Sequence, residues 1–170
     1  MQKIFAQALA LALVVTFLGT TASQAAPKHH RVHGDFKGKV TFSPTNITSG
    51  SYTVKVDADG SLSGLGRCHV VWEGMVSLDA NLQATAGPGL GWKFTRPNGS
   101  ALQGTIQWQA GSSTNQPGIY LATGLLQSTQ GTGKLEGATG QGTILAHINA
   151  LKGKATLRVD GFVNLPRHKG

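Results

Sequence analysis

Three histidines near residue 30 form the part of the sequence best suited to bind a metal ion. His29, His30 and His33 lie within five residues of one another, in a stretch that also carries two basic side chains. Neutral imidazole is a ligand for copper, nickel and zinc, and histidine-rich tracts can bind these ions on composition alone. The alternative that we prefer is a basic tail without fixed structure over residues 26–35. We therefore predict no bound metal and no other cofactor.

The side chains that could transfer protons are Glu73 and His147. A general acid or base must be held beside the reacting atoms of its substrate. Glu73 lies with His69 on the polar side of an alternating segment, and His147 shares a polar face with Asn149. These faces are expected to point to solvent. Both residues are therefore catalytic candidates only if the polar faces of the strands, and not the apolar ones, line the interior. We expect a non-catalytic protein, and the sequence leaves enzymatic activity open.

Four aromatic residues, Trp72, Trp92, Phe94 and Trp108, fall on the apolar sides of their segments. Aromatic side chains that line a concave interior can stack on a flat or lipophilic ligand. The alternative is that they only fill a core. They are the candidate ligand-binding residues, and a small hydrophobic or aromatic molecule is the candidate ligand.

Period-two alternation indicates that β-strands carry these residues. Successive side chains of a strand leave opposite faces, so strict alternation is typical of half-buried strands. Apolar and polar residues alternate over residues 36–42, 52–56, 68–78, 92–94, 102–108 and 155–159. The segments 119–127 and 143–151 are apolar on parts of both faces, and residues 154–163 continue the last alternating run.

Turn signals separate these segments. They include Ser49-Gly50, Asp59-Gly60, Asn98-Gly99 and Pro117-Gly118, all dipeptides that favour chain reversal. Short strands joined by tight turns predict an all-β fold. We expect one domain over residues 36–165, a small antiparallel β-barrel of about eight strands, with a β-sandwich as the alternative.

The glycine-rich stretch from Gly131 to Thr143, GTGKLEGATGQGT, has three possible interpretations. A phosphate-binding loop would need a helix after it, but the residues that follow read as a strand. A flexible linker does not fit the apolar Leu135 or the strands on both sides. A tight, ordered reversal, in which glycines supply positive φ angles and close backbone contacts, fits best.

This stretch resembles the glycine-rich signature of the allene oxide cyclase-like barrel superfamily, which includes plant dirigent proteins and uncharacterised secreted bacterial proteins. SGLGRCHVVWEG, from Ser63, and RPNGSALQGT, from Arg96, are similar to two further stretches of the secreted branch. Leu135, Gly64 and Ser100 stand where those proteins usually carry phenylalanine, histidine and aspartate. The resemblance implies an eight-stranded antiparallel barrel with a wide lumen mouth. It also implies the alternative function, a cyclase or isomerase that shapes a reactive substrate.

The first 25 residues are typical of a secretory signal peptide. Lys3 precedes an apolar run from Ile4 to Leu18, and small residues precede the expected cleavage after Ala25. A membrane-spanning helix would need about 20 apolar residues. We therefore expect a secreted or periplasmic protein without a membrane span.

Charge and cysteine content limit the partners and the chemistry of the chain. Fifteen basic and seven acidic residues give a formal charge of +8, which favours anionic surfaces. Basic side chains in the N-terminal tail and in a second tail, residues 166–170, predict weak association with anionic envelope polymers. The basic residues are dispersed and the aromatic ones internal, so specific nucleic-acid binding is not expected. The lone Cys68 cannot form an internal disulfide, and we expect a buried, inert thiol.

Overall fold

The computed structural model describes residues 28–43, 49–80, 84–86, 90–113, 116 and 118–166. They form nine strands and one short 3-10 helix, η1. In chain order these are β1 (Lys28–Ser43), β2 (Gly50–Leu62), β3 (Gly66–Leu78), β4 (Ala84–Ala86), β5 (Leu90–Thr95), β6 (Ala101–Ser113), β7 (Ile119–Thr132), η1 (Gly133–Leu135), β8 (Thr139–Asn149) and β9 (Lys154–Leu165).

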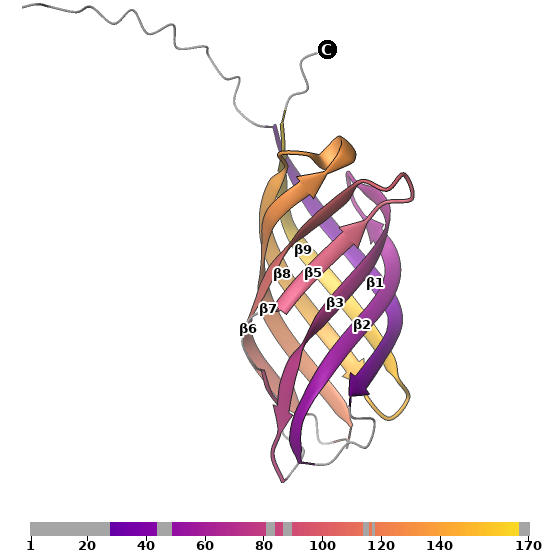
Figure 1. Ribbon diagram of the computed structural model, residues 1–170, viewed down its shortest axis with the longest axis vertical. Coiled ribbons are helices and arrows are strands. Elements are labelled where there is room, and N and C mark those ends of the chain that lie inside the picture. The colour runs from indigo at the N-terminus through magenta and orange to yellow at the C-terminus, as the bar shows by residue number, and fades with distance from the viewer. Residues whose placement is uncertain are drawn as a thin grey trace, which may run out of the picture.

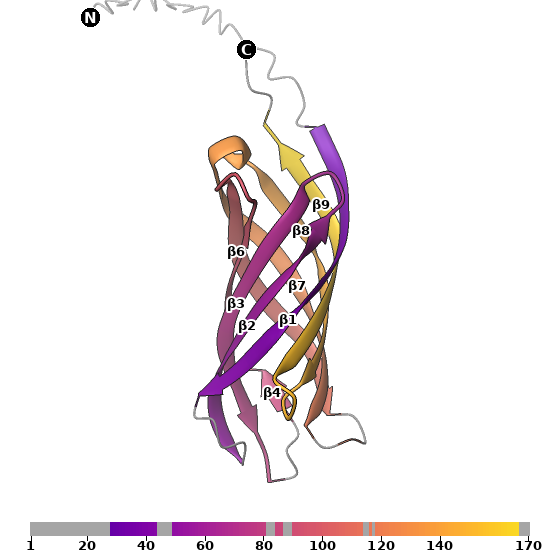
Figure 2. The ribbon, with the colours of Figure 1, turned by 90° about the vertical axis from the view of Figure 1, so that its right-hand side faces the viewer.

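Eight of the strands close into an antiparallel barrel (Figures 1 and 2). The order β2-β1-β9-β8-β7-β6-β5-β3 returns to its start because β2 also pairs with β3, and the short β4 pairs with β3. A sandwich of two packed sheets has no such closure, so the predicted barrel is confirmed and the alternative is excluded.

The two ends of the barrel differ. β1 begins, β9 ends and η1 lies at one end, which we call the upper end (Figure 1). The β8–β9 turn lies at the opposite, lower end (Figure 1). Among the described residues, no helix is long and apolar enough to cross a bilayer.

The inner face of the barrel carries the predicted apolar residues. The side chains of Phe36, Val70 and Ile106 are each 1% exposed, and the polar residues between such positions point outward. Trp108 is the exception among the predicted inward residues, because it is only partly buried. The core therefore follows the period-two pattern of the sequence.

The histidine-rich segment, expected as a tail, is instead the first half of β1. Residues Lys28 to Lys39 pair with β9 from Leu165 to Lys154, so the barrel starts eight residues before the expected Phe36. Val32 and Gly34 are inward and buried, and His30, on the same parity, is partly buried. A glycine contributes no apolar side chain, which is why the alternation was not visible in the sequence.

A second difference concerns Asp59-Gly60, which we expected to form a turn. Both residues lie within β2, where Gly60 pairs with Phe36 of β1 and with Cys68 of β3. A Cβ atom at Gly60 would overlap the backbone carbonyl of Asp35 and the aromatic ring of Phe36. The glycine therefore makes room for a core side chain and does not reverse the chain.

The glycine-rich stretch is an ordered reversal, as predicted. Gly133 and Gly137 have φ angles of 60° and 72°, a region that favours glycine. The backbone N–H of Lys134 donates to Ser100 Oγ at 3.0 Å. Leu135, 2% exposed, lies between the two glycines and packs into the core at the upper end.

Candidate functional site

The upper half of the barrel interior is packed with side chains. Leu62, Leu65, Leu102 and Leu135 are all buried there. The cavity that remains beside them, next to Ser128, has a volume of about 30 Å³, roughly the share of one water molecule in the liquid. This cavity has no room for a ligand larger than a water molecule.

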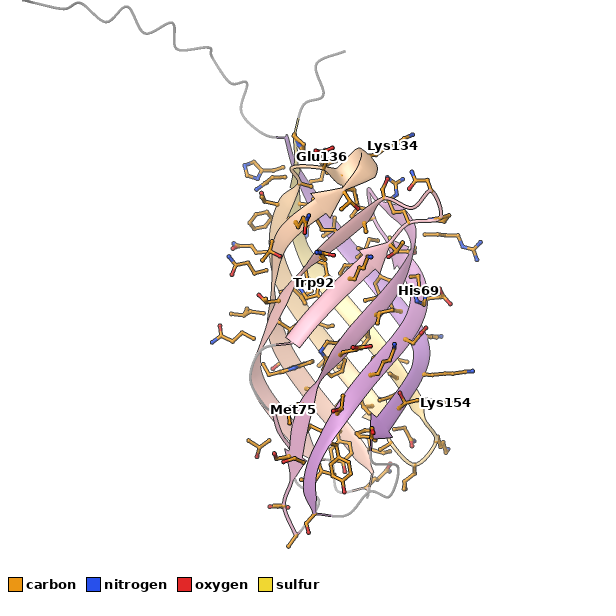
Figure 3. The ribbon with its side chains drawn as sticks, viewed as in Figure 1. His69, Met75, Trp92, Lys134, Glu136 and Lys154 are labelled. Carbon is orange, nitrogen blue, oxygen red and sulfur yellow. The ribbon has the colours of Figure 1, made fainter. Side chains whose placement is uncertain are left out.

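Two of the predicted ligand-binding residues belong to the packed region. The rings of Trp92 and Phe94 lie with centroids 4.9 Å apart, and Phe94 also contacts Phe36 with a centroid distance of 5.4 Å. The indole Nε1–H of Trp92 donates to the carbonyl of Thr105 at 2.9 Å. Figure 3 shows Trp92 on β5. These two aromatic residues have their contacts satisfied within the chain.

The other two predicted residues, Trp72 and Trp108, form a second aromatic pair, and Trp72 lies directly opposite Trp92 in the β3–β5 register. Their ring centroids are 4.9 Å apart and the rings are inclined by 61°, an edge-to-face arrangement that the quadrupoles of aromatic rings favour. Trp72 is 5% exposed, yet its Nε1–H has no hydrogen-bond partner among the residues that the structure describes. The pair therefore combines an apolar surface with an unused buried donor.

Tyr120 carries another unused polar atom on the inner face, as does Ser128 beside the small cavity. Tyr120 lies at the start of β7, close to the lower end, and is 5% exposed, and its hydroxyl has no partner among the described residues. Burial raises the pKa of Tyr120 above its usual value, and the neighbouring Tyr52 raises it further. The phenol therefore stays protonated and can donate a hydrogen bond.

Sequence reasoning missed Tyr120 because β7 is apolar on parts of both faces. Unsatisfied buried polar groups typically cost about 1–3 kcal/mol each. A molecule with a hydrogen-bond acceptor could offset that cost in the lower half of the interior, where Trp108 offers a partly buried aromatic edge.

The interior supplies little for proton transfer. Among the described residues, no carboxylate, histidine, lysine or arginine is buried. The Cys68 thiol is buried, donates to the carbonyl of Gly66 at 3.3 Å, and has a pKa that burial raises above its usual value.

The two candidate catalytic residues lie on the outside and do not form one site. Glu73 Oε1 is 2.9 Å from Lys55 Nζ, and this contact raises the pKa of Lys55. His147 is exposed on β8, which three strands separate from β3 in the sheet order. His69 is also on the outer surface (Figure 3), with Nδ1 3.0 Å from Asp59 Oδ1. Glu73 and His147 therefore face outward, as the alternation predicted, and not into the barrel interior.

The three histidines of β1 are separated by the pleat. His29 packs edge-on against Phe162 on the outer face, with a centroid distance of 6.0 Å. His33 Nδ1 lies 2.7 Å from Asp160 Oδ1, whereas the side chain of His30, on the opposite parity, is partly buried. Within the part of the chain that the structure describes, no group of three or more histidine, cysteine, aspartate or glutamate side chains could hold a metal ion.

The expected association of the tails with anionic polymers stays a prediction. Residues 167–170 lie outside the described residues. The basic residue Arg31 of the N-terminal segment is exposed on β1.

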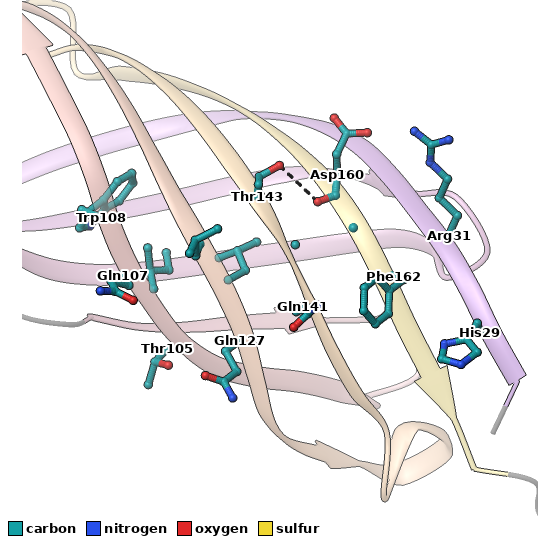
Figure 4. A pocket seen from close by; sticks show the side chains of 15 residues that line it. His29, Arg31, Thr105, Gln107, Trp108, Gln127, Gln141, Thr143, Asp160 and Phe162 are labelled. Atoms are coloured by element: carbon teal, nitrogen blue, oxygen red, sulfur yellow. Dashed lines mark hydrogen bonds between the residues drawn. The ribbon is translucent and has the colours of Figure 1, made fainter. Parts of the chain in front are cut away.

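A broad, open hollow on the outer face extends from β6 across β7, β8 and β9 to β1 (Figure 4). Its floor is held in part by a hydrogen bond of 3.5 Å from the Thr143 hydroxyl to the Asp160 carbonyl. The residues that line it include Trp108, which the sequence predicted on the inner face, and His29, one of the candidate metal ligands. The labelled residues that line it are His29, Arg31, Thr105, Gln107, Trp108, Gln127, Gln141, Thr143, Asp160 and Phe162.

Comparisons with known proteins give a fold likeness only. No family model matches the sequence, and no curated protein matches it. Among solved structures, the pterocarpan synthase dirigent protein PsPTS1 aligns with a TM-score of 0.48 and 16% identity, over 84% of this chain and 99% of that chain. The pterocarpan synthase dirigent protein GePTS1 aligns with the same TM-score and identity, over 97% of this chain and 100% of that chain. The allene oxide cyclase-like and bacterial parts of the resemblance remain predictions.

Proposed function

We propose that the lower half of the barrel interior binds a small, flat, largely apolar molecule that carries a hydrogen-bond acceptor. The observation that carries this proposal is the pair of buried, unused polar groups, Trp72 Nε1–H and Tyr120 O–H. Apolar binding sites commonly use a few polar groups of this kind to orient a ligand. The ligand would rest against the Trp72–Trp108 pair, and the protein would hold it without proton transfer.

Two probes that differ in one hydroxyl group test the proposal. Naphthalene and 2-naphthol have the same fused rings, but only 2-naphthol has an oxygen that can accept a hydrogen bond. We expect both to quench the intrinsic tryptophan fluorescence, with 2-naphthol bound about tenfold more tightly, the effect of one added hydrogen bond. Isothermal titration calorimetry supplies the two dissociation constants.

The double variant Trp72→Phe/Tyr120→Phe should remove the preference for 2-naphthol and keep the binding of naphthalene. Each single variant shows which donor reaches the oxygen. The matched control is Trp92→Phe, because the Trp92 indole already donates to Thr105 and its loss should leave the preference unchanged. Failure of both probes to bind the wild-type protein, or a preference that survives the double variant, would contradict the proposal.

We also propose that the protein acts outside the cytoplasm, in a secreted or periplasmic form. The sequence pattern of residues 1–25 supports this: a basic residue, an apolar run and small residues before Ala25. Intact-mass measurement of material recovered from the medium or periplasm should show a chain that begins at Ala26 or Pro27. A mass that includes Met1 would contradict it.

A further inference from the structure

An exposed leucine stands at the tip of the β8–β9 turn, at the lower end of the barrel. Leu151 is 73% exposed, the most of any large hydrophobic side chain among the described residues. The turn itself is ordered. Lys152 N donates to Asn149 Oδ1 at 2.9 Å, Ala150 N to the Gly118 carbonyl at 2.8 Å, and Gly153 accepts from Val40 N at 3.1 Å. The Leu151 side chain lies over Gly118, where an added Cβ atom would come within 2.5 Å of Leu151 Cγ, and its outer side is open to solvent.

Lysines surround this leucine on the outer surface. Lys152 follows it in the turn, and Lys154 begins β9 directly opposite Lys39 of β1. All three are exposed, and Figure 3 shows Lys154 near the lower end, on the outside of the barrel. Like charges placed directly opposite on neighbouring strands repel each other. An anion between Lys39 and Lys154 would relieve that repulsion.

The carboxylate opposite these lysines in the strand register is Asp57, which faces Lys39 from β2. No ion pair forms between Lys39, Lys152 or Lys154 and any carboxylate within the described residues. Asp57, which lies opposite Lys39 on β2, contacts His69 Nε2 at 3.5 Å instead. We call Leu151, Lys152, Lys154 and Lys39 the basic turn.

We propose that the basic turn docks the protein reversibly on anionic lipid bilayers. Leu151 would enter the boundary between headgroups and acyl chains, and the three lysines would remain among the anionic headgroups. A dissolved acidic polymer would use the lysines but has no apolar phase for the leucine. This surface is separate from the barrel interior, so the proposal does not depend on the ligand proposed above.

Vesicle co-sedimentation tests the proposal. The closed barrel lies entirely within residues 28–166, so residues 26–170 are used, which removes the apolar N-terminal run. We expect partition onto vesicles of 70% phosphatidylcholine and 30% phosphatidylglycerol, weakening with salt, and little onto pure phosphatidylcholine. Leu151→Ser should lower the partition coefficient at least tenfold. Lys39→Glu/Lys154→Glu should lower it at least 25-fold, because each lysine that is removed costs about a factor of five.

Matched controls change the same residue types elsewhere. Leu145→Ser alters an outer leucine of β8 that is 43% exposed, and Lys134→Glu alters η1 at the upper end. Both should stay within twofold of wild type, with circular dichroism verifying the fold of every variant. Leu151→Trp supplies an independent readout, because its fluorescence should shift to shorter wavelength on anionic vesicles.

Three co-sedimentation results would overturn the proposal: no partition onto anionic vesicles, an equal loss in the control variants, or full binding by Leu151→Ser when Lys39→Glu/Lys154→Glu has lost it. The last result would identify a site for soluble polyanions. A Leu151→Trp spectrum that vesicles do not change would also overturn it.

Discussion

Trp72 of β3 and Trp108 of β6 meet edge to face within the barrel, with ring centroids 4.9 Å apart. Trp92 lies between them in the sheet order, on β5, but its indole N–H donates to Thr105. The Trp72 indole N–H has no partner within the described part of the chain. The same residue type is therefore hydrogen-bonded at one position and left with an unused donor at a neighbouring strand.

This difference predicts unequal effects of the same substitution. Trp72→Phe and Trp92→Phe remove similar volume from the core, but only Trp92→Phe breaks a hydrogen bond. We expect Trp92→Phe to lower the free energy of unfolding by about 1 kcal/mol more than Trp72→Phe does. Urea unfolding of both variants measures the difference. Equal losses would indicate that the Trp72 N–H has a partner in the unliganded protein.

We expect the Tyr120 hydroxyl to strengthen ligand binding without stabilising the free barrel. Tyr120→Phe removes a buried hydroxyl without a partner, so the free barrel should keep its stability or gain up to about 1 kcal/mol. The same change should weaken the preference for 2-naphthol if this hydroxyl reaches the ligand oxygen. Thermal unfolding and calorimetry measure the two effects. A loss of more than about 1 kcal/mol in the unliganded protein would show that the hydroxyl is already satisfied.

Substitution of the two candidate catalytic residues should not change probe binding. Glu73 pairs with Lys55 on the outer surface, and His147 is exposed on β8. Glu73→Gln and His147→Ala should leave the dissociation constants of both naphthalene probes within twofold of wild type. Glu73→Gln should also lower the pKa of Lys55, because Glu73 is the main group that raises it. A large change in probe binding by either variant would mean that the outer face contributes to the site.

The barrel was predictable because apolar residues recur at every second position, which indicates strands with one buried face. Val70, Trp72 and Ile106 all point inward as the pattern indicates. The pattern failed where a glycine takes an inward position. Gly34 hides the start of β1, and Gly60 looks like a turn residue although it lies within β2 beneath Phe36.

The two proposed sites depend on pairings that the sequence does not encode locally. Whether the N–H of Trp72 finds an acceptor depends on backbone groups of other strands, and the sequence cannot show which carbonyls are near it. Lys39 and Lys154 are far apart in the chain and meet only through the β1–β9 register. Local alternation predicts which face of the sheet each residue occupies. Which residues of neighbouring strands meet can be identified only from the strand register.

Cys68 predicts a thiol that does not react in the folded protein. It is 4% exposed, and burial raises its pKa, so the reactive thiolate is scarce near neutral pH. Alkylation by iodoacetamide at pH 8 should be slow in native protein and fast in urea. Rapid labelling of the native protein would contradict this.

The same thiol predicts a loss of stability in alkali. The pKa is raised in the folded state from the usual value of 9.0, so the folded protein holds this proton more tightly than the unfolded chain does. This contribution is complete below pH 9 and declines as pH rises through the folded-state pKa. Cys68→Ala should have a flatter pH dependence of unfolding free energy above pH 9 than wild type. Parallel curves would contradict the assignment.

Two glycines on paired strands predict opposite effects of one added methyl group. A Cβ atom at Gly104 of β6 would overlap the backbone of Gln127 on β7, whereas a Cβ at Gly91 of β5 would meet no atom within 4 Å. Gly104→Ala must separate β6 from β7 and should cost about 1–3 kcal/mol of stability. Gly91→Ala should be neutral or stabilising by up to about 1 kcal/mol, because it only restricts the unfolded chain. Urea unfolding, with circular dichroism as a check on the fold, measures both. Equal effects of the two substitutions would show that the β6–β7 contact at Gly104 is looser than the structure has it.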